Sequence, residues 1–218
     1  MTRSRGLFIT VEGGEGVGKS TNIDFLEKHL QNQGVELVIT REPGGTPLAE
    51  NIRNLLLQVD TEPVDQITEL LLIFASRAQH LKQLIEPALA SGKWVLCDRF
   101  TDATYAYQSG GRQIEPRKVQ MLEQLVQGEM RPDYTLLLDA PVELGMERAR
   151  GRGELDRFER EELDFFHRVR HTYLQLAQES SGRYRIIDAS LSLEAVQQQL
   201  LKVCSELLAC WGVRNNPL

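Results

Sequence analysis

The chain has 218 residues, of which 41% are hydrophobic and 26% are charged, and its formal net charge is −6. This length and balance suit one globular α/β domain, and the acidic charge disfavours duplex nucleic acid, whose partners present a basic face. No apolar run approaches the roughly 18 residues of a membrane span, and three cysteines without metal-ligand spacing or a signal peptide predict reduced thiols and a cytoplasmic location.

Strand-like and helical patterns alternate along the chain. Apolar runs typical of strands cover residues 7–11, 35–40, 94–97, 134–139 and 184–187. Helical patterns lie between them, at 19–33, 47–58, 65–90, 116–128, 142–150, 156–179 and 193–210. This alternation predicts one α/β domain over residues 1–218, with a five-stranded parallel sheet and helices on both faces. Residues 212–218 are expected to form a flexible tail.

A glycine-rich turn follows the first predicted strand. It consists of Gly13, Gly14, Glu15, Gly16, Val17, Gly18, Lys19 and Ser20, and Thr21 continues into the helical pattern. The turn matches G-x-x-x-x-G-K-[ST] between a strand and a helix, where backbone N–H groups and the helix N-terminus hold phosphates. Lys19 would reach the terminal phosphates, and the Ser20 hydroxyl would ligate Mg²⁺. The motif therefore predicts a nucleoside triphosphate site and the three-layer fold of P-loop NTPases.

Polar residues follow each predicted strand, at Glu12, 40–46, Asp98, Asp139 and Asp188. Ligands of open parallel sheets bind beyond the carboxyl ends of the strands, so these residues are expected to share one site. A P-loop enzyme needs a second carboxylate near Mg²⁺. Asp98 suits this role, directly or through water, with Asp139 as its competitor. For Asp139 and Asp188, capping or turn chemistry is an equal alternative.

Two further stretches suit a second, phosphate-bearing substrate. Arg99 follows Asp98, and a guanidinium grips phosphate bidentately; a structural ion pair is the alternative. The turn at 40–46 contains two glycines and presents Arg41 and Glu42 at a strand end. A plain β-turn would look the same.

Two helical stretches carry residues suited to a nucleobase and its sugar. Phe74 and Arg77 share a helix face, where they could sandwich and hydrogen-bond a base, although a core phenylalanine with a surface arginine is the simpler interpretation. Thr104, Tyr107 and Gln108 follow at helical spacing. A glutamine amide can both donate to and accept from a base edge; an exposed polar helix end is the alternative.

Arginines crowd residues 147–159. Arg148, Arg150, Arg152 and Arg157 stand among Gly151 and Gly153 in an otherwise acidic protein. This composition favours a short arginine-rich lid, at about 148–159, that closes on polyphosphate and excludes water. A charged helix end is the alternative.

Taken together, these motifs resemble the bacterial thymidylate kinases, which belong to the P-loop nucleoside monophosphate kinases. The matching segments are the P-loop, TREPGGT at 40–46, DRF at 98–100, AYQ at 106–108 and RGELDRFE at 152–159. The resemblance implies that a cytoplasmic homodimer transfers the γ-phosphoryl group of ATP to dTMP with Mg²⁺, giving dTDP for dTTP biosynthesis. It implies nucleotides as partners, with no nucleic acid and no membrane.

The resemblance also assigns roles to residues. Lys19, Arg99, Arg148, Arg150 and Arg152 would be catalytic, and Ser20 and Asp98 would hold Mg²⁺. The dTMP site would comprise Glu15, Arg41, Glu42, Pro43, Arg53, Phe74, Arg77, Arg99, Thr104, Tyr107 and Gln108. Within it, Arg77 and Gln108 would contact the thymine edge, and Tyr107 would disfavour a 2′-hydroxyl. The family carries a stacking phenylalanine where this chain has Ile73, so either Ile73 or Phe74 would cover the base.

Other functions share these features. A kinase acting on dUMP or CMP would carry the same P-loop, because no spacing argument detects a 5-methyl group. An ATP-driven binding module is a candidate from another class, whereas a GTPase would need an N-K-x-D element that the sequence lacks. The apolar pattern from Ile67 to Leu89 would suit either a dimer interface or a buried helix.

Overall fold

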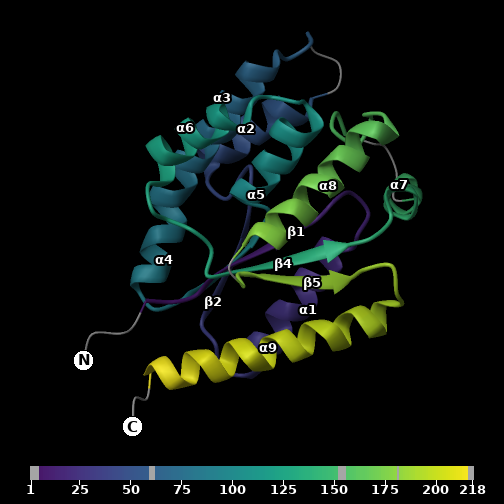
Figure 1. The fold of residues 1–218 in the computed structure, drawn as a ribbon. Helices are drawn as coiled ribbons and strands as arrows, with labels where there is room; N and C mark the ends of the chain where they lie inside the picture. Colours follow the sequence, from purple (N-terminus) through teal and green to yellow (C-terminus); the bar gives the residue numbers. More distant parts are fainter. Residues whose placement is uncertain (1–4, 59–61, 152–155, 181, 216–218) are drawn as a thin grey trace.

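The computed structural model describes residues 5–58, 62–151, 156–180 and 182–215 (Figure 1). Its strands are β1 (Phe8–Glu12), β2 (Leu37–Arg41), β3 (Trp94–Asp98), β4 (Tyr134–Asp139) and β5 (Tyr184–Asp188). They form one five-stranded sheet in the order β2-β3-β1-β4-β5, and every pair is parallel. The predicted parallel sheet is therefore confirmed, with strand ends shifted by one or two residues.

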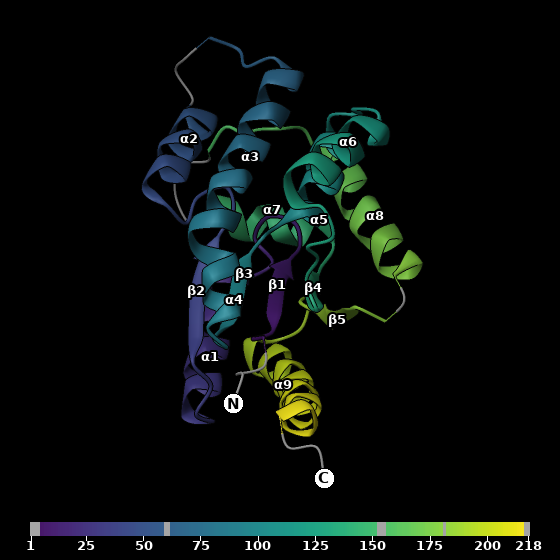
Figure 2. The same cartoon turned by 90° about the vertical axis from the view of Figure 1, so that its left-hand side faces the viewer.

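Helices surround the sheet. They are α1 (Lys19–Asn32), α2 (Pro47–Leu57), α3 (Gln66–His80), α4 (Glu86–Ala90), α5 (Thr101–Thr104), α6 (Pro116–Gln127), α7 (Val142–Arg150), α8 (Leu163–Glu179) and α9 (Leu193–Asn215), with π-helical segments η1 (Leu81–Ile85) and η2 (Tyr105–Gly111). Figures 1 and 2 place α2, α3 and α6 together at the top of the molecule. Across the described ranges, none of these helices combines the length and the apolar character that a membrane crossing needs.

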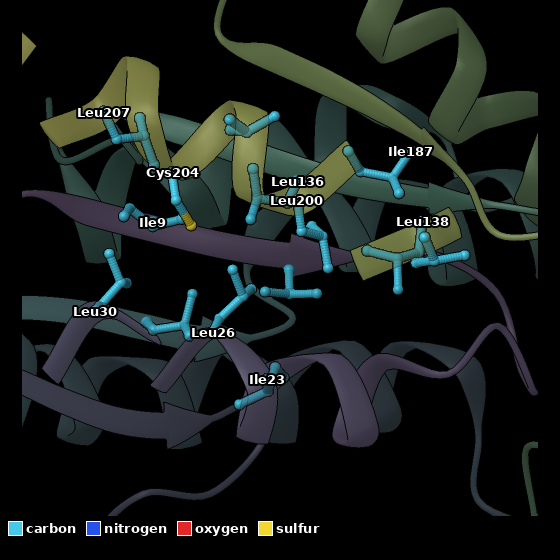
Figure 3. Close-up of a cluster of buried hydrophobic side chains, with 14 of the residues drawn as sticks. Ile9, Ile23, Leu26, Leu30, Leu136, Leu138, Ile187, Leu200, Cys204 and Leu207 are labelled. Carbon is cyan, nitrogen blue, oxygen red and sulfur yellow. The ribbon is translucent and has the colours of Figure 1, made fainter. Parts of the chain in front are cut away.

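The sheet is apolar on both faces because helices cover both, as parallel sheets require. Successive strand side chains point to opposite faces. Ile9 of β1 therefore meets Leu26 of α1 and Leu200 of α9 on one face (Figure 3). Its neighbour Phe8 packs with Ile85 of η1 on the other face. This two-sided core holds the carboxyl ends of the strands in place.

The strand register brings the polar strand ends to one rim. Asp98 of β3 is paired with Val11 of β1 on one side and with Arg41 of β2 on the other. Asp139 of β4 is paired with Asp188 of β5. The strands therefore end nearly level, and the segments that follow them begin at one edge of the sheet.

Several helix boundaries differ from the sequence prediction. Helix α8 begins at Leu163 rather than at 156, because the Asp156 side chain accepts hydrogen bonds from the backbone N–H groups of Phe158 and Glu159 and closes a turn there. Helix α9 continues to Asn215, so residues 212–215 are helical where a flexible tail was expected. Of the predicted lid, residues 148–151 and 156–159 lie within the described chain, and Arg152 lies outside it.

Candidate active site

A cavity of about 290 Å³ lies at the carboxyl edge of the sheet. Its lining includes these predicted site residues: Glu15, Gly16, Val17, Gly18, Lys19, Ser20, Glu42, Pro43, Arg53, Arg77, Asp98, Arg99, Thr104, Tyr107 and Gln108. Ile73, Phe100, Asp156, Phe158 and Glu159 are among the residues that complete the wall. The structure thus brings segments far apart in the sequence to one site.

The P-loop turns tightly from β1 into α1. Gly16 has a φ of 65°, and a Cβ there would lie 1.8 Å from the carbonyl oxygen of Gly145 in α7, so only glycine fits. The Lys19 Nζ donates to the carbonyl oxygens of Gly13 and Gly14, at 3.2 and 2.7 Å. Burial, followed by the nearby Arg99, lowers the pKa of Lys19. The lysine is thus a desolvated cation aimed along the loop.

The remaining P-loop residues divide between two places. Gly13 and Gly14 line a smaller cavity next to β4, together with Asp139. Ser20 stands in the first turn of α1 and lines the main cavity. Thr21 is exposed and lines neither cavity, so its predicted contact with the nucleotide has no geometric support.

The two candidate metal-binding carboxylates have different surroundings. Asp98 lines the main cavity, and its buried Oδ1 has no hydrogen-bond partner within the described residues. Asp139 holds Arg170 with both oxygens, at 2.7 and 2.9 Å. Mg²⁺ prefers oxygen ligands such as hydroxyls and carboxylates. Asp98 and Ser20 fit it, whereas Asp139 already has a partner.

Arg99, Glu15 and Tyr107 form one cluster on the cavity wall. Arg99 adopts a φ of 66°, which turns its side chain toward the P-loop. Its Nη2 donates to Glu15 Oε1 at 2.8 Å, and the Tyr107 hydroxyl donates to the same oxygen at 2.7 Å. The Arg99 guanidinium also lies 4.5 Å from the centre of the Tyr107 ring. The predicted phosphate-binding arginine and the predicted sugar-contacting residues are therefore in direct contact.

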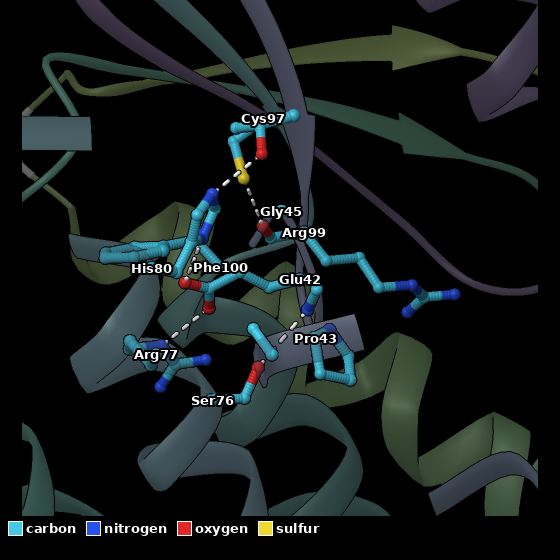
Figure 4. A network of polar contacts seen from close by, with 12 residues as sticks. Glu42, Pro43, Gly45, Ser76, Arg77, His80, Cys97, Arg99 and Phe100 are labelled. Carbon is cyan, nitrogen blue, oxygen red and sulfur yellow. Dashed lines mark hydrogen bonds and ion pairs between the residues drawn. The ribbon is translucent and has the colours of Figure 1, made fainter. Parts of the chain in front are cut away.

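Arg77 is buried at the far end of the cavity, with 1% of its surface exposed, so its interpretation as a surface arginine is wrong. Figure 4 shows Arg77 and His80 converging on Glu42. The Arg77 Nε donates to Glu42 Oε2 at 2.6 Å, and its Nη2 donates to Thr104 Oγ1 at 2.9 Å. The buried Nη1 has no partner among the described residues. Arg77 is thus fixed through Nε and Nη2 and keeps its Nη1 amino group for a ligand.

Phe74 does not occupy the position expected of a base-stacking residue. It is buried in a cluster with Leu70 and does not line the cavity, whereas Ile73 does. The Arg77 guanidinium lies 4.7 Å from the Phe74 ring centre and 5.0 Å from that of Phe100. Phe74 lies three positions before Arg77 on α3, so its ring packs against the Arg77 guanidinium and not at the cavity wall. Ile73, one position earlier, forms the cavity wall.

Several predicted cations lie away from the cavity. Arg41 pairs with Glu50 at 2.7 Å and is half exposed, so it does not line the cavity, whereas Arg53 does. Arg148 donates to the carbonyl oxygen of Ala189 at 2.8 Å, and Arg150 is exposed. The geometry does not bring these arginines to the site, apart from Arg53.

Two buried acids support the site: Glu12, which the sequence placed at a strand end without a role, and Glu69, which sequence reasoning missed. Glu12 accepts from the Phe100 backbone N–H at 2.7 Å and from the Tyr173 hydroxyl at 2.8 Å, and burial raises its pKa to about 8. Glu69 accepts from Gln108 inside the protein. A signal for Glu69 existed, because it lies four and eight positions before Ile73 and Arg77, on the inward face of α3.

The parallel sheet, the P-loop at its rim and a second set of arginine and amide groups in the same cavity define a P-loop kinase. A sequence model of the thymidylate kinase family matches residues 11–200. The chain therefore belongs to the thymidylate kinase family.

Individual relatives agree with this assignment. A thymidylate kinase of Ectopseudomonas mendocina (strain ymp) is 58% identical over 208 residues, which cover 95% of this chain and 99% of the relative. One from Pseudomonas syringae pv. tomato is 59% identical over 203 residues, which cover 93% and 97%. The crystal structure of thymidylate kinase from Ehrlichia chaffeensis matches with a TM-score of 0.76 at 33% identity, covering 92% of this chain and 99% of that one.

Proposed function

We propose that this chain transfers the γ-phosphoryl group of ATP to dTMP in the cytoplasm, with Mg²⁺, giving dTDP for dTTP biosynthesis. The observation that carries the proposal is that Arg77 and Gln108 both line the cavity that also contains Lys19. Arg77 offers an N–H donor there, and Gln108 gives its amide nitrogen to Glu69, which leaves its carbonyl oxygen as an acceptor.

This donor and acceptor suit one edge of thymine. Thymine presents the O4 acceptor next to the N3–H donor, whereas cytosine presents an amino donor next to a ring acceptor. Arg77 and Gln108 therefore complement thymine and oppose cytosine. Uracil shares the thymine edge, so dUMP remains the strongest alternative acceptor. The apolar Ile73 on the same wall favours a base over a polar metabolite.

Phosphoryl transfer needs positioning and positive charge more than proton removal, because a phosphate acceptor is already ionised. Lys19 would neutralise the transferring group, and Arg99 and Arg53 would hold the acceptor phosphate. Ser20 and Asp98 would hold Mg²⁺, which supplies further charge neutralisation on the donor phosphates.

We assign the remaining positive charge that phosphoryl transfer needs to arginines of the predicted lid. Helix α7 packs on the P-loop through Gly145, where a Cβ would lie 2.4 Å from the carbonyl oxygen of Glu15. The middle of α7 therefore lies next to the proposed triphosphate site. Arg148 and Arg150 belong to α7 and Arg152 comes two residues after it in the sequence, and these three arginines are the lid candidates.

Turnover of alternative acceptors tests the function. With ATP and Mg²⁺ we expect dTMP to be phosphorylated in preference to dUMP, CMP and AMP in a coupled ADP-release assay. An equal rate with CMP would exclude the thymine assignment. Release of phosphate without any acceptor would instead support an ATP-driven binding module.

Replacing Tyr107 with phenylalanine should weaken discrimination against ribonucleotides. The Tyr107 hydroxyl donates to Glu15, where we place the sugar, and we propose that it takes the space that a 2′-hydroxyl would need. We expect the preference for dTMP over its ribose counterpart, measured as a ratio of kcat/KM, to fall about three- to tenfold. Tyr105→Phe is the matched control, because that hydroxyl bonds Glu123 and lies outside the cavity. An unchanged ratio would refute the role of Tyr107.

We also propose a homodimer built on α2, α3 and α6. These helices pack together, α3 against both others. They expose large apolar side chains at Leu48, Leu55, Ile67, Leu71, Met121 and Leu125. Contiguous apolar patches on a protein surface mark interaction sites. The later part of the apolar pattern from 67 to 89 does not contribute, because Leu81, Ile85 and Leu89 are buried within the chain.

Leu125→Glu should convert the dimer to a monomer. Leu125 is 80% exposed in the chain, so a charge there costs little folding energy but would be buried in the proposed interface. Light scattering after size-exclusion chromatography measures the mass. Leu193→Glu, at a leucine of α9 that is 45% exposed, is the control and should leave the mass unchanged. A Leu125→Glu protein with the mass of the parent would place the interface elsewhere.

A further inference from the structure

Glu69 is a buried carboxylate that accepts hydrogen bonds from several side chains. It lies on α3 with 1% of its surface exposed, and it does not line the cavity. Three side chains donate to it: Gln108 Nε2 at 2.9 Å, Arg112 Nε at 3.3 Å and Arg157 Nη2 at 2.6 Å. They come from η2, from the residue after it and from the 156–160 turn. Burying one carboxylate among three segments needs partners of this kind.

The contact with Glu69 decides which end of the Gln108 amide faces the cavity. A carboxylate only accepts hydrogen bonds, so the group opposite it must be the amide NH₂ of Gln108. The Gln108 carbonyl oxygen is then the group left for a ligand. Gln108 alone could present either end of its amide to a base, and Glu69 removes that choice.

The two arginines hold Glu69 as an acceptor. Arg157 also donates from Nε to the Leu56 carbonyl oxygen at 2.7 Å, which fixes its guanidinium between α2 and α3. Arg112 pairs in addition with Glu161. Both arginines and the Gln108 amide therefore donate to the same carboxylate, whose oxygens act as acceptors in this cluster.

We propose that Glu69 is the positioning residue that sets pyrimidine specificity, by locking the Gln108 amide with its carbonyl oxygen toward the cavity. Glu69 itself does not touch the substrate. This inference rests on the proposed function, since it needs a pyrimidine at Gln108. It assigns discrimination between thymine and cytosine to a residue behind the site as well as to the residues that contact the base.

Glu69→Gln tests the proposal, because it keeps the size of the side chain and changes only its hydrogen-bonding groups. Arg112 and Arg157 would take the new carbonyl oxygen, so the new NH₂ would face Gln108. The Gln108 amide would then rotate and present its own NH₂ to the cavity. We expect the ratio of kcat/KM for dTMP to that for dCMP to fall by roughly tenfold or more, the effect of about one hydrogen bond.

Glu123→Gln is the matched control. Glu123 is also a buried carboxylate on a helix, with Arg131 and Tyr105 as partners, and it lies outside the cavity. We expect Glu123→Gln to keep the parental ratio of kcat/KM for dTMP to that for dCMP. A Glu69→Gln protein that keeps the parental ratio, even with lower rates, would overturn the inference, as would an equal loss of ratio in Glu123→Gln.

Failure of the proposed function and failure of the variant to fold can both be distinguished from failure of the role of Glu69. A parent protein that does not prefer dTMP over dCMP would contradict the proposed function rather than the role of Glu69. If Glu69→Gln does not fold, as judged by circular dichroism, the charge-balanced variant E69Q/R157Q replaces it, with R157Q as its reference. The ratio should then fall in E69Q/R157Q relative to R157Q, and equal ratios would overturn the inference.

Discussion

Replacing Lys19 with alanine is expected to lower kcat by about 10²- to 10³-fold, the contribution of one preorganised donor in a water-excluded site. The Lys19 ammonium is buried, and its hydrogen bonds to the Gly13 and Gly14 carbonyl oxygens hold it along the P-loop. No other lysine lines the cavity within the described residues. The variant therefore loses the one lysine placed beside the proposed transferring group.

The fold should tolerate this change. Burial lowers the pKa of Lys19, which means that the folded protein disfavours the charged form. Removing a desolvated cation costs little stability, and we expect the melting temperature to change by only a few degrees. Lys28→Ala, at an exposed lysine of the same helix, is the control and should keep full activity. Substantial phosphoryl transfer by Lys19→Ala would remove the P-loop lysine from the mechanism.

The sheet and the P-loop could be predicted because their signals are local. Continuous apolar runs such as 94–97 and 134–138 belong to central parallel strands, and the glycine-rich turn lies between a strand and a helix. The strand register could not be predicted from single runs, yet it brings Asp98 level with Val11 and Arg41. Topology placed the strand ends on one rim, but only some of them share the main cavity: Asp98 lines it, whereas Asp139 lines the smaller cavity and Asp188 is exposed.

The buried ion pairs could not be predicted, because they join residues far apart in the chain. Arg77 meets Glu42 across 35 positions, and Glu69 meets Arg157 across 88. Composition alone suggests that an arginine faces solvent. Only tertiary contacts reveal that the Arg77 guanidinium packs against the rings of Phe74 and Phe100, and that Ile73 rather than Phe74 lines the cavity.

The π-helical segment η2 explains a further difference between pattern and structure. An α-helical pattern predicts contacts at every third or fourth residue, whereas η2 closes wider turns. The adjacent residues Tyr107 and Gln108 consequently both line the cavity. Tyr107 donates to Glu15, and Gln108 donates to Glu69. Sequence spacing could identify these two residues but not their separate partners.

Arg152→Ala should reduce kcat by about 10³-fold or more, the range measured for arginines that stabilise transferring phosphoryl groups. Two of the three lid candidates, Arg148 and Arg150, are described, and their surroundings differ. Arg148 donates to the Ala189 carbonyl oxygen, so it already ties α7 to the segment after β5. Arg150 is exposed in the last turn of α7. Arg152 lies outside the described residues and is assigned from the sequence motif alone.

These surroundings predict different losses. Arg148→Ala removes one hydrogen bond, worth about 1 kcal/mol, and should lower the melting temperature by a few degrees with less than about a tenfold change in kcat. Arg152→Ala should affect kcat far more than the KM for dTMP. Lys202→Ala, at an exposed lysine of α9, controls for loss of surface charge.

The split between kcat and KM decides the lid assignment. A group that acts only in the transition state lowers kcat and kcat/KM together, whereas a group that binds the acceptor raises KM. If Arg152→Ala raised only the KM for dTMP, its guanidinium would belong to the acceptor site together with Arg53 and Arg99. The P-loop interior carries Glu15 and no arginine, so the missing transition-state charge would then have to come from Arg150.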